Sequence, residues 1–192
     1  MMRIQSDPHV YGPEDDSYLL LEALTQEMLS GRGLEIGVGT GVIALNICHH
    51  FEEFEGVDIN PRAVELARTN AHLNNLTNIL FFESDLFSEV SGNFDCIIFN
   101  PPYVPADEDI TDIDALSYHG GDDGRQVLDH FLSEVSDHLN PNGKVYVLHS
   151  SLSDIEKTCS MLDSLEFAWD IIARKRLFFE ELVVFKIQRK EE

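Results

Sequence analysis

The chain has 192 residues, of which 43% are hydrophobic, and its formal net charge is −22. This length is enough for one domain with a sizeable core, and no apolar run approaches the roughly 20 residues of a membrane-spanning helix. The N-terminus lacks the apolar segment of a signal peptide, and the three cysteines are far apart without a CxxC pair. We therefore expect a cytoplasmic protein with neither a disulfide framework nor a metal site.

The acidic residues are unevenly distributed. Residues 1–143 contain 26 Asp and Glu against 5 Lys and Arg, whereas residues 144–192 contain 9 against 8. Proteins that bind duplex nucleic acid neutralise its phosphates with a basic patch, and the candidate here is the short run from Arg174 to Arg176. The composition therefore disfavours nucleic acid as the main partner. A basic protein partner and an acid-rich proteome would both account for the charge.

The predicted elements begin after turn-rich residues 1–16. Ser17 is a candidate N-cap for a helix that starts at Tyr18 and ends before the glycines near residue 31. Beyond it, short apolar runs alternate with stretches of helical pattern. The predicted strands cover residues 34–36, 54–57, 79–82, 94–99, 144–149, 169–174 and 182–187. The predicted helices cover residues 42–50, 61–73, 124–139 and 153–165, with a turn at 141–143 and a capping box at 153–156.

This alternation of strands and helices predicts an α/β fold. We expect a Rossmann-like, seven-stranded, mostly parallel sheet with one antiparallel strand and with helices on both faces, because no helix separates the last two strands. Residues 1–192 would form a single domain, with an N-terminal lid and helix over 1–30 and a core over 33–188. Ligands of such sheets bind beyond the carboxyl ends of the strands.

A glycine-rich turn follows the first predicted strand. Gly37, Gly39 and Gly41 can take positive φ angles and let the backbone approach a ligand closely. Asp58 ends the next strand, where a carboxylate can accept both hydroxyls of a ribose. The GxGxxG fingerprint of dinucleotide enzymes is not completed, and the acid Glu35 would repel a pyrophosphate but attract a cationic amine or sulfonium. Together these features favour S-adenosylmethionine over a nicotinamide cofactor.

Two further strand ends carry polar groups. Asp85 follows the third strand, where its carboxylate could reach the amino group of an adenine. Asn100 follows the fourth, in the sequence FNPPY, and its side-chain oxygen can accept one N–H of a planar amino group. The carbonyl of Pro101 can accept the other N–H, and Tyr103 offers a flat face for stacking. That group could belong to adenine, cytosine or a glutamine amide.

The combination of EIGVGTG, VDIN, SDLF and FNPPYVP resembles the class I S-adenosylmethionine-dependent methyltransferases of the HemK/PrmC type. Those enzymes methylate the glutamine of the Gly-Gly-Gln motif in peptide-chain release factors. VYGPEDDS at residues 10–17 and GGDDGR at residues 120–125 are similar to motifs of the short archaeal and eukaryotic branch. The resemblance covers about residues 9–188 and implies a class I methyltransferase fold and protein-glutamine N5-methylation.

The resemblance also implies roles for individual residues. The lid would border the S-adenosylmethionine pocket, the first turn would face the methionine portion of the cofactor, and the following strand ends would hold the ribose, the adenine and the substrate amide. The lid residues are Asp16 and Ser17, and the residues of the first turn are Glu35, Gly37 and Gly39. Asp58 would hold the ribose, and Asp85 with Leu86 would hold the adenine. The catalytic set at the substrate amide is Asn100, Pro101 and Tyr103.

Two expectations concern protein partners. Bacterial members carry an N-terminal helical domain that docks the release factor; this sequence shows none, so docking would use the long loop after Tyr103 or a partner. The short branch works with a small zinc-binding activator protein, which the resemblance places at the edge of the third strand, residues 78–82. An exposed apolar edge strand favours aggregation, so an activator, the protein's own helices or a second copy would have to cover it.

Three other functions stay open. NPPY is shared with adenine N6-methyltransferases that act on DNA or RNA, although the acidic composition disfavours nucleic acid. A non-catalytic subunit that only binds S-adenosylmethionine would not need the amide-binding residues of FNPPY. A nicotinamide dehydrogenase would need a turn that accepts a pyrophosphate, and Glu35 opposes that. Protein acceptors other than a release factor, including lysine, also remain.

Overall fold

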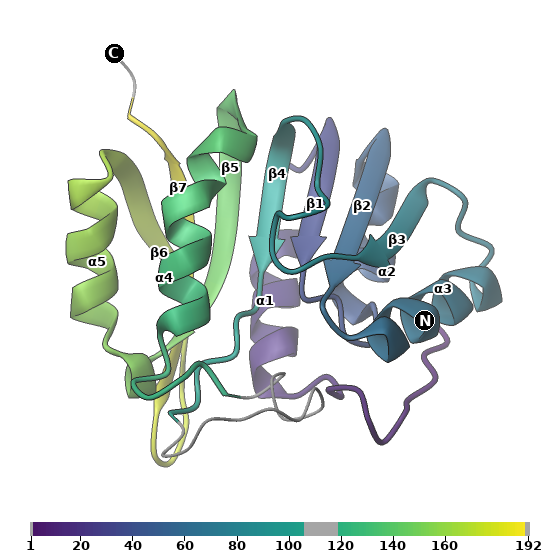
Figure 1. Ribbon diagram of the computed structural model, residues 1–192, viewed down its shortest axis with the longest axis horizontal. Helices are drawn as coiled ribbons and strands as arrows, with labels where there is room; N and C mark the ends of the chain where they lie inside the picture. Colours follow the sequence, from purple (N-terminus) through teal and green to yellow (C-terminus); the bar gives the residue numbers. More distant parts are fainter. Residues whose placement is uncertain (1, 106–118, 191–192) are drawn as a thin grey trace.

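The computed structural model describes residues 2–105 and 119–190. Within these ranges a seven-stranded sheet has the order β3-β2-β1-β4-β5-β7-β6 (Figure 1). The strands are β1 (Arg32–Ile36), β2 (Glu53–Asp58), β3 (Ile79–Glu83), β4 (Phe94–Phe99), β5 (Leu139–Ser150), β6 (Phe167–Arg176) and β7 (Glu181–Arg189). The helices are α1 (Asp15–Thr25), α2 (Val42–Ile47), α3 (Pro61–Leu73), α4 (Gln126–Glu134) and α5 (Ile155–Ser164). Short 3₁₀ turns are η1 (Cys48–His50), η3 (Val135–His138) and η4 (Ser151–Ser153).

The pairing of the strands confirms the predicted topology. Strands β3, β2, β1, β4 and β5 are mutually parallel, and β7 is antiparallel to both of its neighbours, β5 and β6. Side chains alternate between the two faces of the sheet. In β4, Cys96 and Ile98 pack in the core layer that contains α1, α2 and α3, while Ile97 and Phe99 pack in the layer that contains α4 and α5. Helices therefore cover both faces, as expected for a class I methyltransferase fold.

Four predicted boundaries are wrong in informative ways. The first helix begins at Asp15 with Glu14 as its N-cap, so Ser17 lies inside the first turn. The N-cap of α5 is Asp154, whose carboxylate accepts the Lys157 N–H, and not Ser153. The helix predicted to reach residue 139 ends as α4 at Glu134 and continues as η3. The turn predicted at 141–143 lies within β5.

That stretch of β5 is a bulge. Phe94 pairs with Leu139 and Cys96 pairs with Lys144, so the register advances two residues along β4 but five along β5. The Pro-Asn-Gly sequence is thus accommodated by extra residues in a continuous strand rather than by a chain reversal. Of the helices in the described ranges, none has the length and apolar character needed to cross a membrane.

The first helix is fixed by the last strands of the chain. Helix α1 packs against β5, β6 and β7. Asp15, at its start, pairs with Lys175 near the end of β6 at 3.0 Å. Just beyond its end, Glu27 pairs with Lys186 of β7 (2.6 Å) and accepts the hydroxyl of Tyr146 of β5 (2.8 Å). The lid is therefore anchored by elements that follow it by more than 100 residues.

The carboxyl ends of the parallel strands meet at one edge of the sheet, at the bottom of Figure 1. Because β6 runs antiparallel to β7 and β7 antiparallel to β5, the turn between β6 and β7, residues 177–180, also lies at this edge. The start of α1 reaches the same edge through its contact with Lys175. This geometry gathers the strand ends, the lid and the β6–β7 turn around one region.

Candidate active site

A cavity of about 360 Å³ occupies this edge, within the size range of small-molecule sites. The structure places every site residue predicted from the sequence around it, whereas their individual roles stay predictions. The residues are Asp16, Ser17, Glu35, Gly37, Gly39, Asp58, Asp85, Leu86, Asn100, Pro101 and Tyr103.

The turn after β1 depends on its glycines. Gly37, Gly39 and Gly41 have φ angles of +68°, +51° and +80°, a region that side chains rarely adopt. A Cβ atom on Gly39 would also lie 3.3 Å from the carbonyl oxygen of Tyr11, so the lid passes closely over this turn. The turn leaves backbone, rather than side chains, facing the cavity.

Asp58 at the end of β2 is held by two backbone donors. Its Oδ2 accepts the Gly39 N–H at 3.0 Å and its Oδ1 accepts the Asn60 N–H at 2.9 Å. Each oxygen keeps a second lone pair for a ligand hydroxyl. Burial raises the pKa of Asp58, while the two N–H donors act in the opposite direction. The carboxylate is therefore fixed in a bidentate pose that suits a diol.

Glu35 has a structural role that the sequence did not reveal. It is almost completely buried, and its Oε2 accepts the Ala44 N–H in the first turn of α2 at 2.8 Å. Burial raises its pKa well above the usual range, and the charge of Asp58 adds to this shift. Two carboxyl groups in one buried region favour a cationic ligand, because a positive charge offsets the cost of ionising them.

Replacing Asp58 with alanine should weaken S-adenosylmethionine binding by about 1.5–3 kcal/mol, the range for hydrogen bonds to a charged group. Titration calorimetry measures this directly. Glu83→Ala is the matched control, because this substitution removes the same charge from an exposed position at the end of the neighbouring β3. An unchanged affinity in Asp58→Ala would remove the ribose assignment.

The turn after β3 is tightly built. The Ser84 hydroxyl donates to the Leu86 carbonyl oxygen at 2.8 Å and accepts the Glu89 N–H at 3.1 Å. Leu86 has a φ angle of +46°, which is strained for a side chain of its size. The hydrogen bonds hold this strained turn, so that Asp85 and Leu86 line the cavity at a fixed position.

The side-chain amide of Asn100 uses its nitrogen, but not its oxygen, in a hydrogen bond to the described residues. Its Nδ2 donates to Asp16 Oδ2 at 3.0 Å, and its Oδ1 is buried and has no hydrogen-bond partner among the described residues. The Tyr11 hydroxyl donates to the same Asp16 oxygen at 2.7 Å. Burial first, and the nearby Asp16 charge second, raise the pKa values of Tyr11 and Tyr103. A buried acceptor that lacks a protein partner beside a cavity is suited to a ligand N–H.

The GGDDGR motif packs on the backbone that follows Asn100. The Gly120 N–H donates to the Val104 carbonyl oxygen at 3.0 Å. A Cβ atom on Gly120 would lie 2.6 Å from the carbonyl oxygen of Pro102. A Cβ atom on Gly124 would lie 2.4 Å from the carbonyl oxygen of Tyr103. Only glycines permit this contact, so the motif supports the FNPPY segment. The remainder of the loop after Tyr103, predicted to dock the substrate, lies outside the described residues.

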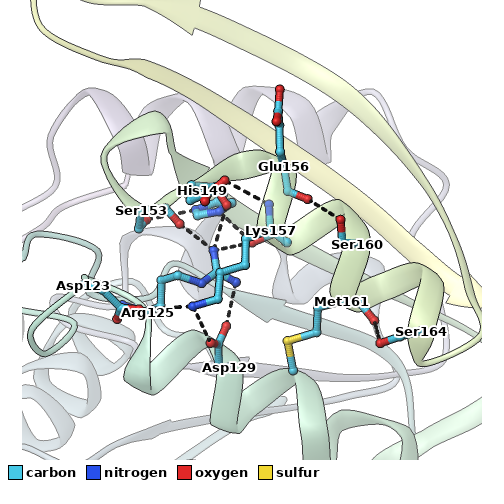
Figure 2. Close-up of polar contacts among 12 residues, drawn as sticks. Asp123, Arg125, Asp129, His149, Ser153, Glu156, Lys157, Ser160, Met161 and Ser164 are labelled. Atoms are coloured by element: carbon cyan, nitrogen blue, oxygen red, sulfur yellow. Dashed lines mark hydrogen bonds and ion pairs between the residues drawn. The ribbon is translucent and has the colours of Figure 1, made fainter.

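Arg125 anchors this motif to the start of α5 (Figure 2). The side chain is 1% exposed, and its Nη1 donates to the carbonyl oxygens of Ser153 and Asp154 and to Thr158 Oγ1. Its Nη2 pairs with Asp129 Oδ1 at 2.6 Å. The sequence revealed the motif but not this buried network, because the three partners of Nη1 are 28 to 33 residues away.

His149 completes the network. Its Nδ1 accepts the Ser150 N–H at 3.0 Å, which leaves Nε2 to donate to Thr158 Oγ1 at 2.8 Å. The ring is fully buried. Burial, with the neighbouring Arg125 charge, lowers the pKa of His149 from 6.5 to about 4. His149 is therefore neutral near pH 7.

This shift predicts a loss of stability in mild acid. Between pH 6.5 and about 4 the unfolded chain binds a proton at His149 that the folded chain does not, so acidification favours unfolding by up to about 3 kcal/mol. Urea denaturation at a series of pH values in this range gives the slope of the unfolding free energy against pH, which is compared between the wild type and His149→Gln. His50→Gln, at an exposed position, is the control. Equal slopes in wild type and His149→Gln would contradict the assignment.

Within the described ranges, no three His, Cys, Asp or Glu side chains are grouped to hold a metal ion.

Comparisons with known proteins show the family of this chain. The family model for the methyltransferase small domain, MTS, matches residues 2–116. A relative from Methanocaldococcus jannaschii, named "Putative protein N5-glutamine methyltransferase MJ0928", is 45% identical over 98% of this chain and 96% of its own length. A release factor glutamine methyltransferase from Deinococcus radiodurans is 32% identical over 74% of this chain, which spans 55% of that protein.

A solved structure is also similar. Mtq2 from E. cuniculi, in its complex with Trm112, superimposes with a TM-score of 0.76 at 26% identity, over 95% of this chain and 99% of that one. The description of that complex gives it as responsible for methylation of the translation termination factor eRF1.

Proposed function

Because the chain belongs to the HemK/PrmC-like protein glutamine methyltransferases and carries their MTS domain, we propose that it methylates N5 of the glutamine in the Gly-Gly-Gln motif of a peptide-chain release factor. S-adenosylmethionine would be the methyl donor. The observation that carries the proposal is the buried Oδ1 of Asn100 beside the cavity, which no donor in residues 2–105 and 119–190 satisfies. Such a substrate would be met in the cytoplasm, the location that the sequence predicts.

The residues around the cavity fit S-adenosylmethionine, which supplies an electrophilic methyl group on a sulfonium. Asp58 would accept the ribose hydroxyls, and Asp85 with Leu86 would frame the adenine. Glu35 and the positive-φ glycines would face the charged methionine end, where buried carboxyl groups favour a cation.

The substrate amide would lie against FNPPY. Asn100 Oδ1 would accept one N–H and the Pro101 carbonyl oxygen the other, while Tyr103 would cover one face of the amide. Two donors used in this way leave the nitrogen lone pair directed at the methyl group. Orientation of this kind can lower a barrier by roughly 7–11 kcal/mol without a strong base.

The rivals fit less well. Adenine in DNA or RNA could use the same Asn100 acceptor, but the net charge of −22 opposes a phosphate backbone. A subunit that only binds S-adenosylmethionine has no use for an unsatisfied buried acceptor, which costs about 1–3 kcal/mol.

An activator protein is proposed at the free edge of β3. This strand ends the sheet, and Leu80 on it is 60% exposed. A shallow pocket beside it is lined by Arg68, His72 and Leu76. An added strand would satisfy the edge and cover Leu80. We propose a small zinc-binding protein as the partner, supported by the resemblance to Mtq2 in its complex with Trm112.

The β6–β7 turn offers a surface for a protein substrate. Phe178 and Phe179 are 91% and 86% exposed, and the next residue, Glu180, lines the cavity. Exposed aromatic pairs next to a binding site are typical anchors for a protein partner. We propose that they contact the release factor beside its glutamine.

The double change Phe178→Ala and Phe179→Ala should raise KM for the protein substrate about tenfold or more, because each lost anchor costs about 1 kcal/mol or more. The affinity for S-adenosylmethionine should stay the same. Met28→Ala, which removes a side chain that is 90% exposed elsewhere, is the control. An unchanged KM would exclude this contact. If sedimentation showed a dimer of the wild type and a monomer of the double variant, Phe178 and Phe179 would instead form a contact between two copies of the chain.

A labelled-methyl transfer assay tests the proposed function. The substrates are the release factor of the same organism, a version with the motif glutamine replaced, and single-stranded and duplex DNA, each with and without the zinc-binding partner. Label on the intact release factor alone would support glutamine methylation. Comparable label on DNA would identify adenine as the methyl acceptor. Methylation rates that do not depend on the zinc-binding partner would contradict the proposed activator.

A further inference from the structure

We infer that Asp16 is a positioning residue that fixes which end of the Asn100 amide faces the substrate. This inference rests on the proposed function, since it concerns how the acceptor for the substrate amide is oriented. The sequence placed Asp16 only in the lid that borders the cofactor pocket. The geometry points to a second task, directed at the methyl acceptor.

The orientation of Asn100 follows from the chemistry of its partner. Asp16 Oδ2 lies 3.0 Å from Asn100 Nδ2, and an ionised carboxylate can only accept hydrogen bonds. The amide nitrogen must therefore face Asp16. The oxygen is directed away from it, at a residue that lines the cavity, and is buried with no partner in the part of the chain that the structure describes. If the amide were reversed, an NH2 group would meet the N–H groups of the substrate.

The carboxylate itself is held from several sides. Tyr11 donates its hydroxyl to Oδ2 at 2.7 Å, and Ser17 donates both its backbone N–H and its hydroxyl to Oδ1. Asp16 is 3% exposed, and its partners in the described residues are all neutral. A buried carboxylate without a cation is costly, and this cost indicates a functional constraint.

The charge of Asp16 has an additional effect on Asn100. A hydrogen bond from Nδ2 to a carboxylate polarises the amide and makes Oδ1 a stronger acceptor. The same orientation discriminates between substrates. A glutamine amide presents donors to Oδ1, whereas a glutamate carboxylate presents only acceptors and would be repelled. Asp16 therefore supports both the strength of the contact and its selectivity for an amide.

The isosteric change Asp16→Asn tests this inference because it should reverse Asn100. The Ser17 backbone N–H cannot turn away, so the new amide keeps its oxygen toward Ser17 and directs its NH2 at Asn100. Asn100 then rotates its oxygen toward residue 16 and its nitrogen toward the substrate. Tyr11→Phe removes one support but leaves the orienting carboxylate, so its effect should be smaller.

We expect Asp16→Asn to lower kcat at least about tenfold, while the Kd for S-adenosylmethionine changes by less than about threefold. The double variant Asp16→Asn with Asn100→Ala should be no slower than Asn100→Ala alone, because the two residues act as a unit. Glu22→Gln, which removes one charge at an exposed position of the same helix, is the matched control and should behave as the wild type.

A spectroscopic measurement is independent of turnover. The side-chain NH2 resonances of Asn100 in a ¹⁵N-labelled sample should be slow to exchange in the wild type and lose that protection in Asp16→Asn. Loss of cofactor affinity without loss of kcat, additive losses in the double variant, or unchanged Asn100 resonances would each overturn the inference. A wild type that labels no glutamine would instead refute the proposed function, and the resonances would still decide the role of Asp16.

Discussion

Replacing Asn100 with alanine is expected to lower kcat for the release factor by about 100- to 1,000-fold, the range for loss of one oriented group at a reacting centre. The variant removes Oδ1, the buried acceptor that has no partner among the described residues. The substrate amide would lose one of the two acceptors that direct its lone pair. Because the proposed hydrogen bonds to the cofactor come from other residues that line the cavity, such as Asp58, the Kd for S-adenosylmethionine should change by less than about threefold.

Single-turnover kinetics with saturating cofactor and calorimetry of cofactor binding separate these two effects. Asn142→Ala, in the exposed bulge of β5, is the control for loss of an amide elsewhere. Comparable losses in turnover and in cofactor affinity would show that Asn100 is mainly part of the pocket wall, and would move the methyl acceptor away from FNPPY.

Replacing Arg125 with methionine is expected to lower the free energy of unfolding by about 3 kcal/mol, the low end of the range for breaking a buried ion pair. The low end applies because Asp129 is 32% exposed and can be solvated after the change. The carbonyl oxygens of Ser153 and Asp154 would lose their buried donor. Methionine keeps most of the side-chain volume, so the loss reports the polar contacts rather than a cavity.

Urea denaturation measures this loss, and Arg62→Met on the exposed face of α3 is the control. Activity should fall in the same variant, because Arg125 anchors the glycines that pack on the Pro102 and Tyr103 carbonyl groups. Stability equal to that of the wild type would show that the network is dispensable for folding. Reduced stability with full activity would show that the GGDDGR motif is not needed to support FNPPY.

The sequence was sufficient for elements whose signals are local. Helix α3 runs over Pro61–Leu73 as predicted, because Asn60 caps it and Pro61 suits its first turn. The residues at the strand ends that face the cavity were found because apolar runs stop at Asp58 and Asn100 and shortly before Asp85. Parallel strands bring such ends together, so the set of site residues could be assembled from the sequence.

The failures are of two kinds, ambiguous local signals for helix N-caps and interactions between distant segments. Nothing near Ser17 distinguishes an N-cap from a residue two positions inside the helix. Asp154 was overlooked because the preceding serine satisfies the same capping pattern. The link between Asp16 and Asn100 spans 84 residues, and that between Arg125 and Thr158 spans 33. Such contacts follow from the packing of the whole sheet and leave no periodic signal.

The anchoring of α1 by β5, β6 and β7 has a consequence for the order of folding. Helix α1 also packs on α2, but its contacts with β5, β6 and β7 can form only after those strands, which follow it by more than 100 residues, have been synthesised and paired. Long-range contacts of this kind slow folding, because the chain must close a large loop before they form. A nascent chain that ends before β6 would carry the glycine turn and Asp58 but would lack a fixed Asp16. A complete cofactor site therefore requires that β6 and β7 have paired and hold α1.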